Sequence, residues 1–83
     1  MSTQQKTVLF VCSGNAARSQ MAEAILRSQD SVRFQAFSAG TQPRDALDPR
    51  TVQVLEKMNL STEGLYPKSL AHFADQTFDF IIT

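Results

Sequence analysis

The chain has 83 residues, of which 42% are hydrophobic and 19% are charged, and eight basic residues balance eight acidic ones. This length fits a single domain, which we expect over residues 7–83 behind a flexible tail of residues 1–6. Zero net charge and the lack of an apolar run near the roughly 18 residues that cross a bilayer argue against nucleic-acid and membrane partners and favour a cytoplasmic protein.

A strand, a small-residue turn and a helix are predicted first. Residues 7–11 are apolar and rich in β-formers without alternation, which is typical of a strand buried on both faces of a parallel sheet. Residues 12–19 form a turn, and a helical pattern follows. One apolar stripe of that helix comprises Met21, Ala22, Ile25 and Leu26.

A second strand and a second helix come next. Residues 32–38 alternate in polarity and predict a strand that Ala39 and Gly40 close, and residues 41–47 indicate a loop. Asp48 and Pro49 mark a helix start, as N-cap and first helical residue. The predicted buried face of this helix comprises Val52, Val54, Leu55 and Met58.

The last third of the chain predicts a short helix and a third strand. Residues 61–68 are expected to be irregular, Ser69 to cap a short helix through Ala74, and residues 78–83 to form the strand. This order favours an α/β fold of three layers, with a parallel sheet and helices on both faces. Because the chain stops at the end of a strand, we expect the domain to be incomplete after that strand.

The turn from Cys12 to Ser19 has the features of an oxyanion-binding loop. Backbone N–H groups at a helix N-terminus hold tetrahedral anions, and Arg18 adds a forked cation that can bind two oxygens. Gly14 permits backbone conformations that side chains forbid, and Asn15 tolerates left-handed geometry. The predicted oxyanion-binding residues are Ser13, Gly14, Asn15, Ala16, Ala17 and Arg18.

Cys12 lies at the base of this loop and is the candidate nucleophile. The same N–H groups and helix dipole would lower its pKa below about 8.5, and Ser19 could donate a hydrogen bond to the sulfur. A lone cysteine after a strand is often only a small core residue. Here the glycine, the asparagine, the arginine and the following helix agree on chemistry, whereas the Gly-Lys-Ser/Thr ending of a nucleotide-binding loop does not occur.

The segment Val8-Leu9-Phe10-Val11-Cys12-Ser13-Gly14-Asn15-Ala16-Ala17-Arg18-Ser19 resembles the active-site loop shared by low-molecular-weight protein tyrosine phosphatases and the related arsenate reductases. Further landmarks occur in family order at residues 38–41, 48–50 and 78–82, so the resemblance covers nearly the whole chain. Gln20, where the phosphatases usually carry proline, together with residues 38–41 and 67–70, is similar to the reductase branch. We therefore favour an arsenate reductase-like enzyme, with a phosphotyrosine phosphatase as the alternative.

The resemblance implies three catalytic residues: Cys12 as nucleophile, Arg18 as the residue that binds the oxyanion and stabilises the transition state, and Ser19 as the partner of the thiolate. It implies arsenate or phosphate as ligand, with phosphotyrosine protein as the alternative substrate. No bound cofactor or metal is implied. A reductase would use an external thiol reductant: glutathione, mycothiol or the thioredoxin system.

The sequence also departs from the family pattern. The general-acid aspartate and the resolving cysteines of the relatives lie beyond Thr83, and neither Asp75 nor Asp79 takes the acid role by motif. Cys12 is the one cysteine, so an internal disulfide relay is excluded for these residues. The lone histidine, His72, is expected to be an ordinary surface or half-buried residue, and the charges of Asp45, Asp48 and Arg50 to be caps or solvated.

A third hypothesis is an inactive or oxyanion-binding fragment. The resemblance implies a sheet in which the third strand is an exposed edge. Such an edge favours self-association, which predicts a homodimer through residues 78–82.

Overall fold

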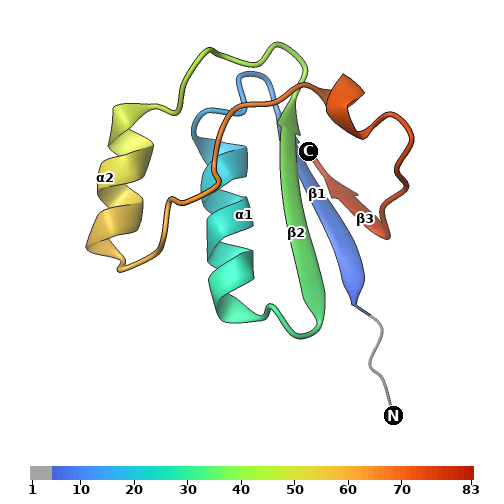
Figure 1. Cartoon of the computed structure of the whole chain (residues 1–83), viewed down its shortest axis with the longest axis horizontal. Coiled ribbons are helices and arrows are strands. Elements are labelled where there is room, and N and C mark those ends of the chain that lie inside the picture. Colours follow the sequence, from blue (N-terminus) through green and yellow to red (C-terminus); the bar gives the residue numbers. More distant parts are fainter. Residues whose placement is uncertain (1–4) are drawn as a thin grey trace.

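The computed structural model describes residues 5–83 and has alternating strands and helices (Figure 1). The elements are β1 (Lys6–Cys12), α1 (Arg18–Gln29), β2 (Phe34–Gly40), α2 (Pro49–Lys57), the 3₁₀ helix η1 (Leu70–Phe73) and β3 (Phe80–Ile82). None of the helices within residues 5–83 has the length and apolar character needed to cross a membrane.

The three strands form one parallel sheet in the order β2-β1-β3. The central strand pairs Val8 with Ala36 of β2 and with Phe80 of β3. Val8 and Leu9 are buried, which explains why this strand lacks alternation. The chain leaves β1 toward one neighbour and later returns on its other side, so the end of β1 lies where ligands bind in open parallel sheets.

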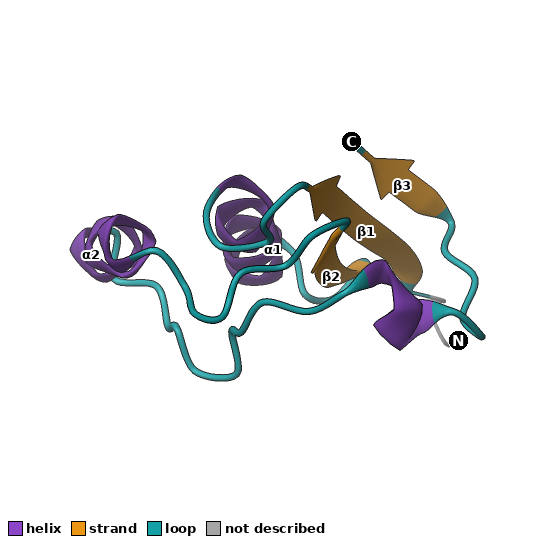
Figure 2. Ribbon diagram, turned by 90° about the horizontal axis from the view of Figure 1, so that it is seen from above, coloured by secondary structure: helices purple, strands orange, loops and turns teal. Residues whose placement is uncertain are grey.

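Helical segments cover both faces of the sheet, as the sequence predicts (Figure 2). Ser38 in β2 donates a hydrogen bond to Glu23 of α1, whereas its neighbour Phe37 packs edge-on against Phe73 of η1. Successive strand residues point to opposite faces, so α1 and η1 lie on opposite sides. Helix α2 packs against α1 on the side away from the sheet.

The apolar core lies between the two α-helices and the segment after α2. Leu55 of α2 is fully buried and packs with Ala24 of α1 and Leu65. A second cluster of edge-on aromatic contacts, made by Phe37, Phe73 and Phe78, covers the other face of the sheet. Apolar or aromatic contacts therefore stabilise the fold on both sides of the three-stranded sheet.

The buried face of α1 differs from the predicted apolar stripe. Its buried residues are Ser19, Gln20, Glu23 and Ala24. The predicted stripe, comprising Met21, Ala22, Ile25 and Leu26, is only half-buried. The polar side chains face inward because they bond to the loop before α1, to β2 and to the segment after α2.

The first two strands begin and end at residues other than those predicted. Residues 1–4 of the predicted tail lie outside the described residues, but Lys6 begins β1, since its N–H donates to the Arg33 carbonyl at 2.8 Å. Strand β2 starts at Phe34, after a turn in which Asp30 accepts from the Arg33 N–H. Val32 therefore lies outside the strand, and β2 continues through Gly40.

The second helix starts as predicted, but Leu55 is the one residue of its predicted buried face that is fully buried. Asp48 accepts a hydrogen bond from the Arg50 N–H, and Pro49 is the first helical residue. Thr51 and Leu55 are the buried residues of α2. Two predicted core residues, Val54 and Met58, are instead 43% and 48% exposed.

The third strand is shorter than predicted. It begins at Phe80, and Asp79 precedes it. The Asp79 carboxylate accepts from the Thr7 N–H at 2.7 Å, so it ties this strand to the start of β1. Ser69 caps η1 as expected by accepting from the Ala71 N–H.

Candidate active site

The loop between β1 and α1 turns its carbonyl groups away from its concave side. The carbonyl oxygens of Cys12, Ser13, Gly14 and Ala16 accept hydrogen bonds from the N–H groups of Thr41, Gln42, Arg44 and Asp48. In a trans peptide the carbonyl and the next N–H point in opposite directions. The N–H groups that follow these carbonyls therefore point into the loop, which is the arrangement that an anion needs.

Cys12 lies at the base of this loop and its sulfur has two close hydrogen-bond partners. The Ser19 hydroxyl lies 2.9 Å from Sγ, and the Asn15 N–H donates to Sγ at 3.3 Å. Asn15 Nδ2 donates to the same Ser19 oxygen at 2.7 Å. Since that oxygen already accepts a hydrogen bond from Asn15, the Ser19 hydroxyl is oriented to donate a hydrogen bond to Cys12 Sγ.

These contacts favour the thiolate form of Cys12. Burial alone raises the pKa of the Cys12 thiol, but hydrogen bonds from Ser19 and Asn15 and the charge of Arg18 outweigh it and hold the pKa below its ordinary value. Arg18 is exposed at the first position of α1 and lines the same cavity as Cys12. The structure thus brings the three predicted catalytic residues together.

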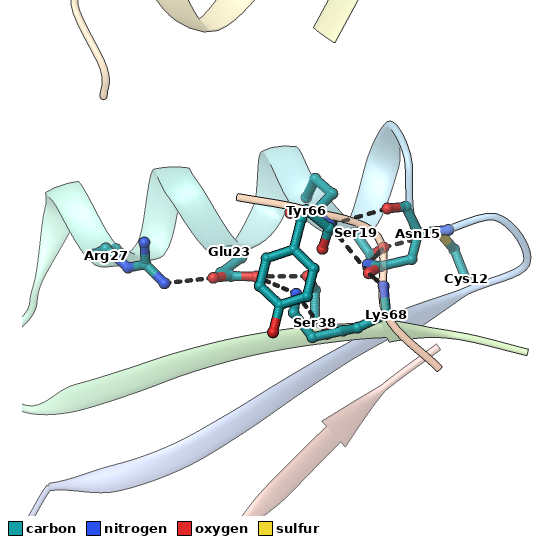
Figure 3. A network of polar contacts seen from close by, with 9 residues as sticks. Cys12, Asn15, Ser19, Glu23, Arg27, Ser38, Tyr66 and Lys68 are labelled. Carbon is teal, nitrogen blue, oxygen red and sulfur yellow. Dashed lines mark hydrogen bonds and ion pairs between the residues drawn. The ribbon is translucent and has the colours of Figure 1, made fainter. Parts of the chain in front are cut away.

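Asn15 fixes the shape of the loop. It is fully buried and adopts a left-handed φ of 48°, as the sequence predicts. Its side-chain oxygen accepts from the Lys68 N–H at 2.8 Å and from Gln20 Nε2 at 3.0 Å. Helix α1 and the segment that contains Lys68 therefore both hold the Asn15 side chain (Figure 3).

Gln20 links the loop to the segment before η1. Its Nε2 group lies 2.9 Å from the Asn15 carbonyl oxygen and 2.7 Å from the Tyr66 carbonyl oxygen. Its Oε1 atom is buried and has no hydrogen-bond partner among the described residues. The residue that separates the two branches by resemblance is thus a brace of the loop.

An ionic cluster around the buried Glu23 lies next to Gln20 on α1. Glu23 accepts from the Ser38 hydroxyl at 2.5 Å, pairs with Arg27, and lies 3.9 Å from Lys68 Nζ (Figure 3). Lys68 Nζ also donates to the Ser38 carbonyl at 3.3 Å. Burial lowers the pKa of Lys68, and the nearby Glu23 carboxylate partly opposes this shift. The Lys68 N–H donates to the Asn15 side chain, so the cluster also fixes the residue that holds Asn15 in place.

Two glycines have roles that differ from the expected ones. Gly14 has no positive φ, so the predicted backbone reason is wrong; a side chain there would instead meet Arg44 at 3.2 Å. Gly40 was not predicted as a site residue. A Cβ at Gly40 would lie 2.6 Å from the Ser13 carbonyl oxygen and 2.9 Å from Asn15 Cβ. The loop of residues 12–19 can adopt this conformation only if residue 40 is a glycine.

A polar cavity of about 460 Å³ opens above the loop. All the predicted oxyanion-binding residues, 13–18, line it together with Cys12. The far wall comprises Gln42, Arg44, Asp48 and Arg50. The sequence analysis missed Gln42 and Arg44, and it placed Asp48 and Arg50 in caps or solvent although both also face this cavity. In the sequence, Gln42 and Arg44 follow the family landmark at residues 38–41. That position is the one signal that could have indicated their place at the site.

A second cavity, of about 330 Å³, lies on the other side of Cys12 and Arg18. Its lining includes Phe10, Ala22 and Ile82, so it is mainly apolar. Asp79 lines neither cavity and lies beside the start of β1. His72 is exposed, and its ring packs edge-on against Phe73. Within residues 5–83, no three His, Cys, Asp or Glu side chains gather as metal ligands would.

Comparison with known proteins gives two groups of relatives. The low molecular weight phosphotyrosine protein phosphatase of Schizosaccharomyces pombe is 38% identical over 95% of this chain and 56% of its own length. Arsenate reductase 2 of Staphylococcus epidermidis is 27% identical over 86% of this chain and 56% of its own length. The chain thus spans little more than half the length of these curated relatives.

Solved structures show the same two groups. A thioredoxin-dependent arsenate reductase of Corynebacterium glutamicum has a TM-score of 0.86 at 27% identity and covers 98% of this chain and 41% of its own. A low molecular weight protein tyrosine phosphatase of T. tengcongensis has a TM-score of 0.81 at 30% identity, over 93% and 56% of the two chains. Residues 7–83, nearly the whole sequence, match one family description, and the chain therefore belongs to the low molecular weight phosphotyrosine protein phosphatase family.

Proposed function

We propose that this chain carries the thiolate half of an arsenate reductase, with Cys12 as the nucleophile. The observation that supports the proposal is the position of Cys12 Sγ at the base of a loop whose N–H groups face a polar cavity. The walls of that cavity are polar or small and, among the described residues, include no aromatic side chain. Such a cavity suits a small inorganic oxyanion better than an aryl ester.

The first step joins sulfur to arsenic. The Cys12 thiolate attacks the arsenic atom, an S–As bond forms, and one As–O bond breaks as its oxygen leaves as water after taking up protons. Arg18 and the inward N–H groups bind the remaining oxygens and stabilise the charge that develops on them. The Ser19 hydrogen bond keeps the sulfur ionised before the attack.

The second step requires an external thiol. Its sulfur attacks Sγ of Cys12, forming a mixed disulfide, and the electron pair of the S–As bond stays with arsenic. Arsenic passes from the +5 to the +3 state and leaves as arsenite, while the two sulfurs are oxidised. A second equivalent of thiol then reduces the mixed disulfide and restores Cys12. Glutathione, mycothiol or a thioredoxin would supply these thiols.

Arsenate-dependent consumption of reductant tests this proposal. The purified chain should consume thiol only when arsenate is present, and Cys12→Ser should abolish the consumption. Ser28→Ala, on the exposed side of α1, should leave it unchanged. If none of the three thiol systems is consumed with arsenate, reduction by this chain is excluded.

The alternative is hydrolysis of phosphotyrosine in proteins through a phosphocysteine on Cys12. The 38% identity to the Schizosaccharomyces pombe phosphatase favours it. An aryl leaving group needs little protonation, so a trace of this activity would not require a general acid. Hydrolysis of an aryl phosphate faster than arsenate turnover, lost in Cys12→Ser, would assign the chain to this branch.

We further propose that the protein acts in the cytoplasm and pairs with a second copy through β3. The exposed apolar residues Phe80, Ile81 and Ile82 on that strand support the pairing. The measurement that tests it is given in the Discussion.

A further inference from the structure

The cavity above the loop has more room than one oxyanion needs. A water molecule occupies about 30 Å³ of liquid, and a tetrahedral oxyanion displaces only a few waters. The cavity, of about 460 Å³, is several times larger and extends from the loop to Gln42, Arg44, Asp48 and Arg50. A second chemical group can therefore lie beside the oxyanion.

The charge of the cavity wall is positive. Three arginines, Arg18, Arg44 and Arg50, stand against one aspartate, Asp48. Asp48 is already paired with Arg50 at 3.1 Å. Among residues 5–83, the Arg44 side chain makes no hydrogen bond or ion pair, so its charge is available to a ligand.

Arg44 is held beside the loop by its own backbone. Its N–H donates to the Gly14 carbonyl at 2.9 Å. Its side chain crosses Gly14, with Cγ and Nε 3.2 Å from the place where a Cβ would stand. Arg44 Nε, and with it the guanidinium group, therefore lies beside Gly14 of the loop, and Arg44 lines the same cavity as Arg18.

We propose that Arg44 forms an outer anion subsite that binds the carboxylate of a small thiol. A forked guanidinium can bind a carboxylate through two parallel hydrogen bonds. A thiol bound in this way lies in the same cavity as Cys12, the residue that the second step of the proposed reaction requires it to reach. The choice of a thiol rests on the proposed arsenate reduction, whereas the anion subsite itself does not.

Alkylation of Cys12 by two reagents that differ in charge tests the subsite. Iodoacetate and iodoacetamide both form an S–C bond and release iodide, but only iodoacetate carries a carboxylate. Arg44→Gln should slow the reaction with iodoacetate about two- to fivefold, the size of one exposed charge pair. The reaction with iodoacetamide should not change. Equal slowing of both reagents, or of neither, overturns the subsite.

Disulfide exchange tests the class of ligand. The Cys12 thiolate attacks glutathione disulfide or cystamine, forms a mixed disulfide and releases one thiolate. Arg44→Gln should slow the exchange with glutathione disulfide, which carries carboxylates, and not that with cystamine, which carries amines. A preference for iodoacetate without a preference for glutathione disulfide overturns the assignment to a small thiol and favours a protein reductant.

The controls separate this proposal from the proposed function. Arg33→Gln removes an arginine that pairs with Asp30 before β2, outside the cavity, and should alter no ratio. The dependence of the iodoacetamide rate on pH reports the Cys12 pKa alone, so a failed loop would show there and not in the ratio. If Arg44→Gln does not fold, the wild-type preference for iodoacetate must still weaken as salt is added; a preference that salt leaves unchanged overturns the subsite.

Discussion

At the scale of single residues, the direction of one hydrogen bond determines whether the Cys12 thiolate is stabilised. Ser19 Oγ accepts a hydrogen bond from Asn15 and therefore donates a hydrogen bond to the sulfur. This hydrogen bond exists only because Asn15 adopts a left-handed φ and is fully buried. Sequence reasoning reached Cys12, Asn15 and Ser19 because they occur together with a glycine and an arginine between a buried strand and a helix.

Removal of the Ser19 hydroxyl should make Cys12 less reactive at neutral pH. In Ser19→Ala the thiolate loses a hydrogen bond, so the Cys12 pKa rises and the thiolate is populated only at higher pH. A hydrogen bond to a charged group is worth about 1.5 kcal/mol, so alkylation at pH 7 should slow by up to about tenfold. The iodoacetamide rate against pH gives the midpoint. Ser28→Ala is the matched control, and equal midpoints for both variants would contradict the prediction.

A methyl group at Gly40 should displace the loop. Its Cβ would meet backbone and Cβ atoms of Ser13 and Asn15 within 3 Å, and these cannot move aside easily. Gly40→Ala should cost about 1–3 kcal/mol of unfolding free energy and raise the Cys12 pKa. Gly14→Ala is the comparison, since its Cβ meets only the flexible Arg44 side chain. Urea denaturation measures both, and an equal loss for the two variants would refute the argument.

At the scale of elements, α1 joins the loop to the sheet through its polar face. Gln20 and Glu23 face inward, and both reach the segment that precedes η1. Hydrophobic periodicity could not reveal this, because both side chains are polar and each has a partner, Tyr66 or Lys68, more than 40 residues later. Gly40 was missed for the same reason: its constraint comes from the loop at Ser13 and Asn15.

Neutralising Lys68 should weaken the fold and disturb the loop. Lys68→Met keeps the backbone hydrogen bond to Asn15 but leaves the buried Glu23 with Ser38 and Arg27 alone. We expect a loss of about 1–3 kcal/mol by urea denaturation, as for a buried group that loses a partner. The alkylation midpoint of Cys12 should rise. Lys57→Met, on exposed α2, should change neither, and an unchanged midpoint in Lys68→Met would separate the cluster from the loop.

At the scale of the whole molecule, the order of strands and helices along the chain followed from the sequence, and so did the presence of helices on both faces of a parallel sheet. These features depend on local patterns and on the rules of parallel sheets. The limits of the elements did not follow. Val32, Val54 and Met58 are apolar yet exposed, since tertiary packing selects which side of each element is covered.

The edge strand should drive self-association. Phe80, Ile81 and Ile82 are 51%, 60% and 49% exposed on a strand that pairs on one side with β1. Sedimentation velocity should show a dimer whose fraction rises with protein concentration. Ile81→Lys should shift the protein toward monomer, whereas Val32→Lys, an equally apolar exposed position before β2, should not. A monomer at every concentration would contradict pairing through β3.

The bond between the Lys68 amide and Asn15 has a consequence for the order of folding. It closes a loop of 53 residues, so the thiolate environment of Cys12 cannot be complete until the last third of the chain has docked. Hydrogen exchange at the Lys68 amide therefore reports assembly of the site. An oxyanion bound in the loop should slow that exchange by population linkage, although the anion itself never touches Lys68.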